Sequence, residues 1–467
     1  MSEKTTISLP ADYRNPASFE ESRENPCNFS RNRKLHVVVA GVYFVFNSSL
    51  GSSLSSGADD EIARQFAIPR DGLKMVLPTS LYMAGFAVGP LLFGPLSEHV
   101  GRKPVLVATY SIYLLFTMGC ALASTFAQLL VFRFFCGLGG SAPNAVLGGL
   151  FSDIYNDPHQ RGLAMSWFMF ATTFPPLLGP IISGFVSTVS WRWAFWAGLI
   201  IASPGLPFLL TMPETYTPVL LRRGGESSDD SSKAQTQPSM LSILGRPFAM
   251  FFQESIVFCC SMYLALVYST LYLYFQAYPI VFQDLYGMTP GIGGLAFLPI
   301  LPGSILAFIV FFLYSSHHTK ALQAGHPWAR VEEYRRLPLA CIGAPAIPIA
   351  LFWLGWSANP SLSPIMPMMS GVFFGFGYLL IFIALLNYLT DAYKQFSASA
   401  SAAASTCRSV FAVCLPLATT AMYGTLGIDW ASSLLGFFSV AMAGIPFLFI
   451  RFGARIRAGI FSGLYID

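Results

Sequence analysis

Three ionisable side chains lie inside long apolar stretches of this sequence: Arg133, Glu254 and Arg408. An ionised group in hydrocarbon is costly unless it faces a cavity or a partner, so each is a candidate for function. Glu254 lies about six residues into a stretch that we place at 248–275, roughly 9 Å along a helix. It is the deepest carboxylate, and we interpret it as a site of reversible proton binding. The alternative is a fixed salt bridge between helices.

The two arginines offer complementary chemistry. Arg133 could assist a proton relay or anchor a substrate, or it could be a structural arginine that bonds carbonyl groups of a neighbouring helix. Arg408, near mid-depth of its stretch, could neutralise an anion or serve as a structural charge. A guanidinium pairs well with a carboxylate, so either residue could bind an acidic ligand.

Five uncharged polar side chains in or near apolar stretches are candidates to line a substrate-binding cavity. Each could equally form hydrogen bonds between helices, which is the ordinary use of such groups in a membrane. The five are Asn47, Asn144, Tyr263, Gln276 and Asn387.

The composition predicts a membrane protein. Of 467 residues, 54% are hydrophobic and only 11% are charged, whereas soluble domains carry about 25% charged residues. The net charge of +4 is too small to suggest nucleic-acid binding. All six histidines lie at the ends of apolar stretches or between them, so we expect no metal site, no cofactor and no enzyme activity.

Twelve apolar stretches long enough to span a bilayer begin at Leu35, and they predict an all-α membrane protein. A polar linker at 212–247 divides them into six and six. Within it, residues 224–232 read as disordered. We therefore expect a tail at 1–34, bundles at 35–211 and 248–455, and a tail at 456–467. Placing both termini in the cytoplasm puts most of the 27 Lys and Arg residues on that side.

A motif between the second and third stretches carries a resemblance. Residues 94–104 read GPLSEHVGRKP, which resembles the loop signature G-x-L-x-D-R-x-G-R-[RK] of the major facilitator superfamily. Glycines permit a tight turn and close helix approach. An acid and a basic pair could form a charge latch between the bundles. We therefore predict a gating role for Gly94, Glu98, Gly101, Arg102 and Lys103. His99 replaces the first arginine of the signature.

Further segments support this resemblance. Arg133 opens an R-x-x-x-G pattern, and residues 175–184 are similar to the G-P-x-x-G-G element of the antiporter branch. Long segments of the second half, such as residues 271–282, resemble fungal drug:proton antiporters with twelve spans. Many of those relatives carry Glu where this chain has Gln276. The resemblance adds Gly179, Pro180 and Gly184 to the gating set, and Asp153, at the cytoplasmic end of its stretch, completes it.

The resemblance implies two six-helix bundles that rock about a central site. The expected function is proton-coupled export of a small organic molecule, such as a drug or secondary metabolite. An alternative is transport of an organic anion, such as a di- or tricarboxylate, held by Arg133 or Arg408. A polyamine exporter or a channel is less favoured. The expected partners are the substrate, protons and the lipid bilayer, with the protein a monomer, and we expect it in the plasma membrane.

Overall fold

The computed structural model describes residues 22, 24–69, 73–223, 240–393 and 397–460. These residues form helices and turns, with no strand in the described part. Eleven of the helical segments are long and apolar enough to cross a membrane. Most of the tail at 1–34, the run at 224–232 and the last residues, 461–467, lie outside the described residues.

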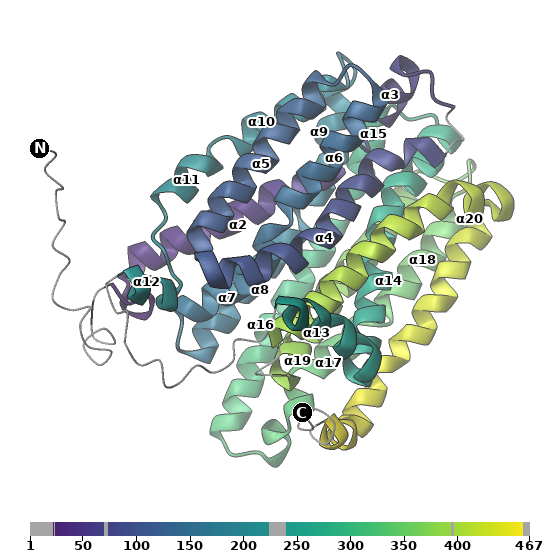
Figure 1. Ribbon diagram of the computed structural model, residues 1–467. Coiled ribbons are helices and arrows are strands. Elements are labelled where there is room, and N and C mark those ends of the chain that lie inside the picture. The colour runs from purple at the N-terminus through teal and green to yellow at the C-terminus, as the bar shows by residue number, and fades with distance from the viewer. Residues whose placement is uncertain (1–21, 23, 70–72, 224–239, 394–396, 461–467) are drawn as a thin grey trace, which may run out of the picture.

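The first group of helices, here called the N-terminal bundle, precedes the linker (Figure 1). Several predicted stretches are built from two helices in series, because Ser141, Phe174 and Pro204 interrupt them. The helices are α2 (Arg31–Ser53), α3 (Asp59–Gln65), α4 (Leu77–Val100), α5 (Arg102–Leu122), α6 (Phe126–Gly140), α7 (Ala142–Ile154), α8 (Pro158–Thr173), α9 (Pro175–Val186), α10 (Arg192–Ala202) and α11 (Gly205–Thr211). Short 3₁₀ turns are found at Pro26–Asn28 and Leu73–Met75.

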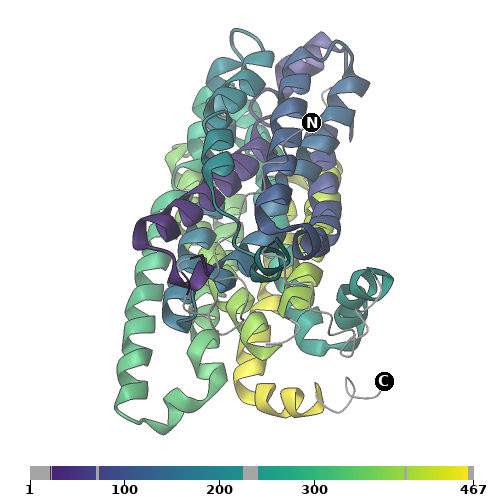
Figure 2. The same cartoon turned by 60° about the vertical axis from the view of Figure 1, so that its left-hand side comes forward.

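The second group, here called the C-terminal bundle, follows the short linker helix α12 (Thr217–Arg223). Figure 2 shows that most helices of both bundles run in a common direction. The helices are α13 (Met240–Gln253), α14 (Ser255–Tyr278), α15 (Pro290–Gly294), α16 (Ile300–Gln323), α17 (Glu332–Gly343), α18 (Ala346–Ser357), α19 (Ile365–Ala392) and α20 (Ser397–Ile460). A π-helical turn at Pro279–Leu285 extends α14, and 3₁₀ turns lie at Leu295–Phe297 and Pro327–Arg330.

The last helical segment, α20, contains two spans. As one straight helix its 64 residues would be about 96 Å long, about three times the thickness of a hydrocarbon core. Gly427 breaks the helix with a φ of 76°. In Figure 1 the chain turns back beside the label α20. Counting both arms of α20 gives the twelve membrane helices that the sequence predicts.

The two ends of the molecule differ in the elements that they carry. We call the end with α12 and α13 the linker end, and the end with α3 and α15 the α3 end (Figure 1). The start of α6 is fixed at the α3 end by a capping box, in which Thr125 and Gln128 each satisfy a backbone N–H of the other. This cap sets the depth of Arg133, two turns further along α6.

Candidate functional site

Arg133 is held entirely by the N-terminal bundle. Its Nε donates to the carbonyl oxygen of Pro78 at 2.9 Å, and its Nη1 to that of Gly51 at 2.7 Å. Its Nη2 donates to the carbonyl oxygen of Ser52 at 3.1 Å and to Ser55 Oγ at 3.3 Å. The side chain is 2% exposed. This geometry fits the structural alternative. The carbonyls of Gly51 and Ser52 lie where α2 ends and would otherwise be unpaired in the membrane, and that of Pro78 lies in the first turn of α4.

Arg408 has a different environment on α20. Its guanidinium lies 5.3 Å from the ring of Tyr268 and 5.2 Å from that of Phe382, and its Nη2 lies 3.4 Å from Ser405 Oγ. The buried Nε has no hydrogen-bond partner among the described residues. A buried cationic donor left unpaired is costly, so Arg408 retains the capacity to bind an acceptor from a ligand.

A chain of polar contacts crosses the bundle interface, from Tyr268, whose ring lies beside Arg408, to Ser52, which binds Arg133. Tyr268 Oη lies 3.2 Å from Tyr272 Oη, and Tyr272 Oη lies 2.9 Å from Ser52 Oγ. The same Ser52 accepts a hydrogen bond from Arg133 through its carbonyl oxygen. The two predicted arginines therefore lie on either side of one interface, and Ser52–Tyr272 is a direct side-chain contact across it.

The uncharged candidates divide into three kinds. Asn47 and Asn387 each donate to a carbonyl one turn earlier in their own helix, at 2.8 and 2.7 Å. Asn144 is half-buried on α7, and Tyr263 is buried on α14 with no partner for its hydroxyl among the described residues. Gln276 alone reaches the other bundle. A substrate-binding role for the five stays a prediction.

The predicted depth of Glu254 is wrong. It lies between α13 and α14 at the linker end, and the span begins at Ser255. The apolar residues before it belong to α13, whose Phe248 and Phe252 are 49% and 78% exposed. In a sequence, the apolar residues of a helix that lies on a membrane surface are easily taken for the start of a membrane span. Glu254 Oε2 accepts a hydrogen bond from the hydroxyl of Tyr393 at 3.0 Å, within the C-terminal bundle.

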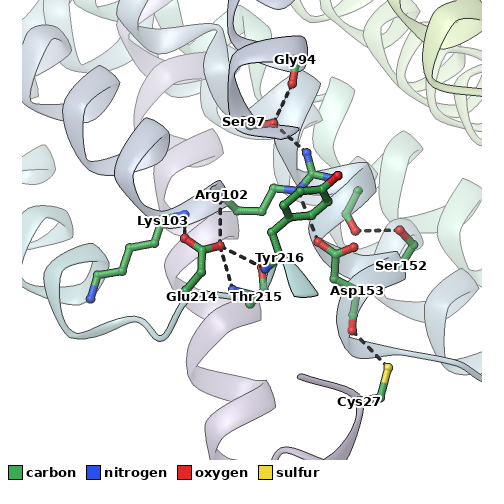
Figure 3. A network of polar contacts seen from close by, with 11 residues as sticks. Cys27, Gly94, Ser97, Arg102, Lys103, Ser152, Asp153, Glu214, Thr215 and Tyr216 are labelled. Atoms are coloured by element: carbon green, nitrogen blue, oxygen red, sulfur yellow. Dashed lines mark hydrogen bonds and ion pairs between the residues drawn. The ribbon is translucent and has the colours of Figure 1, made fainter. Parts of the chain in front are cut away.

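The motif at 94–104 forms a charge network at the linker end (Figure 3). Arg102 Nε lies 3.3 Å from Asp153 Oδ2, and Arg102 Nη1 donates to Ser97 Oγ at 2.6 Å. Gly101 permits the turn before α5 with a φ of 111°, a conformation that favours glycine. These contacts all lie within the N-terminal bundle. The prediction that Arg102 forms a charge latch between the bundles is therefore wrong for the side-chain partners that the structure describes.

The other predicted members of the motif contribute less. Glu98 is exposed at the end of α4. Lys103 engages the network through its backbone N–H, and its side chain points away from the carboxylate in Figure 3. A Cβ added at Gly94 would lie 3.8 Å from that of Ala145, an ordinary contact that does not require glycine.

Glu214 is the central acceptor of this network and is not in the predicted set. Its carboxylate accepts from the backbone N–H groups of Arg102 and Lys103 at 2.9 and 3.2 Å, at the start of α5. It also accepts from those of Thr215 and Tyr216 at 2.9 and 3.0 Å, before α12. One carboxylate thus satisfies free donors at two helix starts. Residues 213–215 match a segment typical of the family. The match does not reveal the role of Glu214, because its partner Arg102 lies 112 residues earlier in the chain.

The predicted gating element of α9 joins the two bundles at the α3 end. A Cβ added at Gly184 would lie 2.6 Å from the carbonyl oxygen of Pro290, and one at Gly294 would lie 2.8 Å from that of Pro180. These distances are too short for any side chain, so α9 and α15 meet backbone to backbone. Gly179 packs against the side chain of Ser53 within the N-terminal bundle, and a Cβ added there would overlap Ser53 Oγ. A gating role for this element stays a prediction.

Asp59, at the start of α3, is a second residue that the sequence analysis missed. It is only 9% exposed, and its Oδ2 lies 3.4 Å from Gln276 Nε2 of the C-terminal bundle. Burial raises the pKa of its carboxyl to about 8. Hydropathy alone places Asp59 in a loop beyond the first span, and so hides this environment.

Comparison with known proteins identifies the class. The family described as Major Facilitator Superfamily matches residues 39–416. "Efflux pump FUB11" of Gibberella moniliformis is 40% identical over 428 residues, covering 88% of this chain and 71% of the relative. "MFS-type transporter traF" of Penicillium crustosum is 36% identical, covering 97% and 94%. "Major facilitator superfamily multidrug transporter mdrA" of Aspergillus fumigatus is 38% identical, covering 94% and 74%.

Solved structures agree on the fold. The "proton:xylose symporter XylE bound to 6-bromo-6-deoxy-D-glucose" superposes with a TM-score of 0.66 at 16% identity, covering 91% of this chain and 96% of that one. The inward open xylose transporter XylE from E. coli gives 0.65 at 16% identity, covering 89% and 95%. The chain belongs to the major facilitator superfamily. It is a multi-pass membrane transporter of small molecules rather than an enzyme, as the sequence predicts.

Proposed function

We propose that this protein exports a small organic molecule from the cytoplasm in exchange for protons. The observation that carries the proposal is similarity over almost the whole chain to fungal proteins named as efflux pumps and multidrug transporters. The bundles predicted at 35–211 and 248–455 would rock about the Ser52–Tyr272 contact, exposing the centre alternately to each side.

In this proposal the linker end faces the cytoplasm and the α3 end faces outward. The basic residues of the N-terminal segment and of the 2–3 and 8–9 connections support that orientation through the positive-inside rule. Both termini are then cytoplasmic. We propose the plasma membrane as the location and a monomer as the working unit, because both bundles of the transport pathway come from one chain.

A second candidate substrate class is favoured by Arg408. The unpaired Nε and the rings of Tyr268 and Phe382 suit a flat molecule that carries a carboxylate. A di- or tricarboxylate without a ring would use the guanidinium alone. The aromatic surroundings therefore favour an acidic aromatic metabolite over a small polycarboxylate.

The test is transport by the full-length protein in liposomes with an imposed pH gradient. The probes are rhodamine 6G as a cationic drug, salicylate as an aromatic acid, citrate as a tricarboxylate and spermidine as a polyamine. We expect saturable transport of rhodamine 6G or salicylate in the direction opposite to proton flow, and we expect a protonophore to abolish it. Flux that is linear in concentration and independent of the gradient would contradict the proposal and indicate a channel.

A further inference from the structure

Asp59 is a buried carboxyl group at the α3 end of the bundle interface. Its Oδ1 is fully buried and has no hydrogen-bond partner among the described residues, while its Oδ2 lies 3.4 Å from Gln276 Nε2. A single long hydrogen bond does not compensate an ionised carboxylate for the loss of its hydration. The closed interface therefore favours the protonated form of this group.

The two partners of this contact belong to different bundles. The segment before Asp59 is fixed to α9, because Gly57 N–H donates to Ser183 Oγ at 3.1 Å and Ser187 Oγ donates to the Gly57 carbonyl oxygen at 3.2 Å. At the end of α3, Trp191 Nε1 donates to Gln65 Oε1 at 2.6 Å. Asp59 is thus fixed to the N-terminal bundle, whereas Gln276 lies on α14. Separation of the bundles at this end must break the contact and admit water.

The surroundings of Asp59 are nearly closed to solvent. A neighbouring cavity lined in part by Gly57, Phe275 and Gly294 has a volume of about 10 Å³, enough for about one water molecule. The charged groups that act on Asp59 are Asp60 of its own helix, which raises its pKa, and Arg133 of α6, which lowers it. From α14 it meets the uncharged Gln276.

We propose that Asp59 is a proton-binding site of this transporter, and that its protonation permits the α3 end of the interface to close over it. The inference rests on the proposed proton exchange and assigns a proton site to it. When the α3 end opens, water reaches Asp59 and the carboxyl ionises more readily. Protons from the outer side then favour closure of that end, which turns the central site toward the linker end.

Proton linkage sets the size of the effect. Because Asp59 binds its proton more tightly in the closed state, the equilibrium constant for opening rises with pH by up to about tenfold for each pH unit. The rise begins near the ordinary pKa of an aspartate, about 4, and levels off near the pKa of the closed state, about 8. A plateau above pH 8 is therefore part of the expectation.

The experiment measures the opening of the α3 end without any substrate. Spin labels are placed on cysteines introduced at Val189 and Ile292, which lie on the two bundles at this end and are 79% and 47% exposed. The accessible native cysteines are replaced by alanine, and the protein is kept in lipid nanodiscs. Distance distributions by double electron–electron resonance are recorded from pH 5 to 9.

We expect a longer-distance population that grows with pH in the parent protein and in Asp59→Glu, which keeps the acid. Asp59→Asn stays at the short distance at every pH, because it mimics the protonated group. Asp60→Asn, the neighbouring control, keeps a pH response, with its upper limit moved to lower pH because Asp60 raises the pKa of Asp59. The same pH response in Asp59→Asn and in the parent would overturn the inference. Gradient-driven transport intact in Asp59→Asn would then leave the proposed function standing without this site.

Discussion

Arg336 Nε lies 3.2 Å from Asp391 Oδ2, joining the start of α17 to the end of α19 in the C-terminal bundle. In the N-terminal bundle Arg102 and Asp153 join the start of α5 to the end of α7 at 3.3 Å. Both pairs connect the third membrane helix of a bundle to its fourth, at the linker end. The repetition is expected of two halves related by an axis along the membrane normal, and it assigns these ion pairs to holding each half together.

The two pairs differ in burial, which predicts unequal effects of removing the acid. The side chains of Asp153 and Arg102 are 17% and 6% exposed, whereas those of Asp391 and Arg336 are 35% and 13% exposed. We expect Asp153→Asn to destabilise the protein by about 3 kcal/mol, since it leaves a buried guanidinium without its counter-charge. Asp391→Asn costs about 1 kcal/mol. Thermal unfolding in detergent ranks the two variants, and equal shifts in Tm contradict this account.

Removing the carboxylate of Glu214 tests its role at two helix starts. Glu214→Ala leaves four backbone N–H groups without an acceptor, and we expect a loss of about 1–2 kcal/mol for each cap. The variant should lower Tm and speed proteolytic cleavage near α12. Glu98→Ala, at an exposed position of the same region, is the control and leaves both unchanged. Unaltered cleavage near α12 in Glu214→Ala would show that the contact does not fix the linker.

The helical class and the number of spans follow from sequence because the bilayer imposes length and composition locally. The depth of Glu254 does not, since only three polar residues, Gln253–Ser255, separate the apolar residues of α13 from those of the span. The role of Glu214 is hidden for another reason. Its acceptor function depends on residues 112 positions away, and no local pattern records a contact of that separation.

Asp59 shows the same limit at the other end of the molecule. It follows the first span in a polar segment, where an aspartate is ordinarily solvated. Only tertiary contacts bury it: α9 and Trp191 hold the segment around it, and α14 places Gln276 beside it. For Arg133 the sequence poses the right alternatives, and the positions of the carbonyl groups of Gly51, Ser52 and Pro78 favour the structural one.

The proton-coupling role of Glu254 stays a prediction, which a matched pair of variants tests. If its carboxyl carries a proton, Glu254→Gln abolishes transport driven by a pH gradient but keeps exchange of labelled for unlabelled substrate. Tyr393→Phe removes only the hydroxyl that donates to Glu254, and it should retain gradient-driven transport. Equal losses of both activities in the two variants would assign Glu254 a structural role at the start of α14.

Arg408 predicts a selective effect on acidic ligands. Loss of a charge-assisted hydrogen bond costs about 1.5–3 kcal/mol, so Arg408→Gln should weaken salicylate binding roughly tenfold to hundredfold. Binding of rhodamine 6G should change little. Arg161→Gln, which removes one positive charge at an exposed position, should leave both affinities as they are. Microscale thermophoresis in detergent measures them, and an equal loss for both ligands argues against anion recognition by Arg408.

The raised pKa of Asp59 predicts how stability depends on pH. The folded-state pKa, about 8, lies above the unfolded value, about 3.9, so the folded protein holds the proton more tightly. The contribution of this group is fully present below pH 4 and is lost as pH rises toward 8. The Tm of the parent protein should therefore fall relative to that of Asp59→Asn between pH 5 and 8. Above pH 8 the difference between the two Tm values should stay constant. Asp60→Asn should show the same kind of fall, ending at a lower pH because the charge that raises the pKa of Asp59 is gone. A constant difference between the parent and Asp59→Asn at all pH values would place Asp59 in an ordinary, solvated environment.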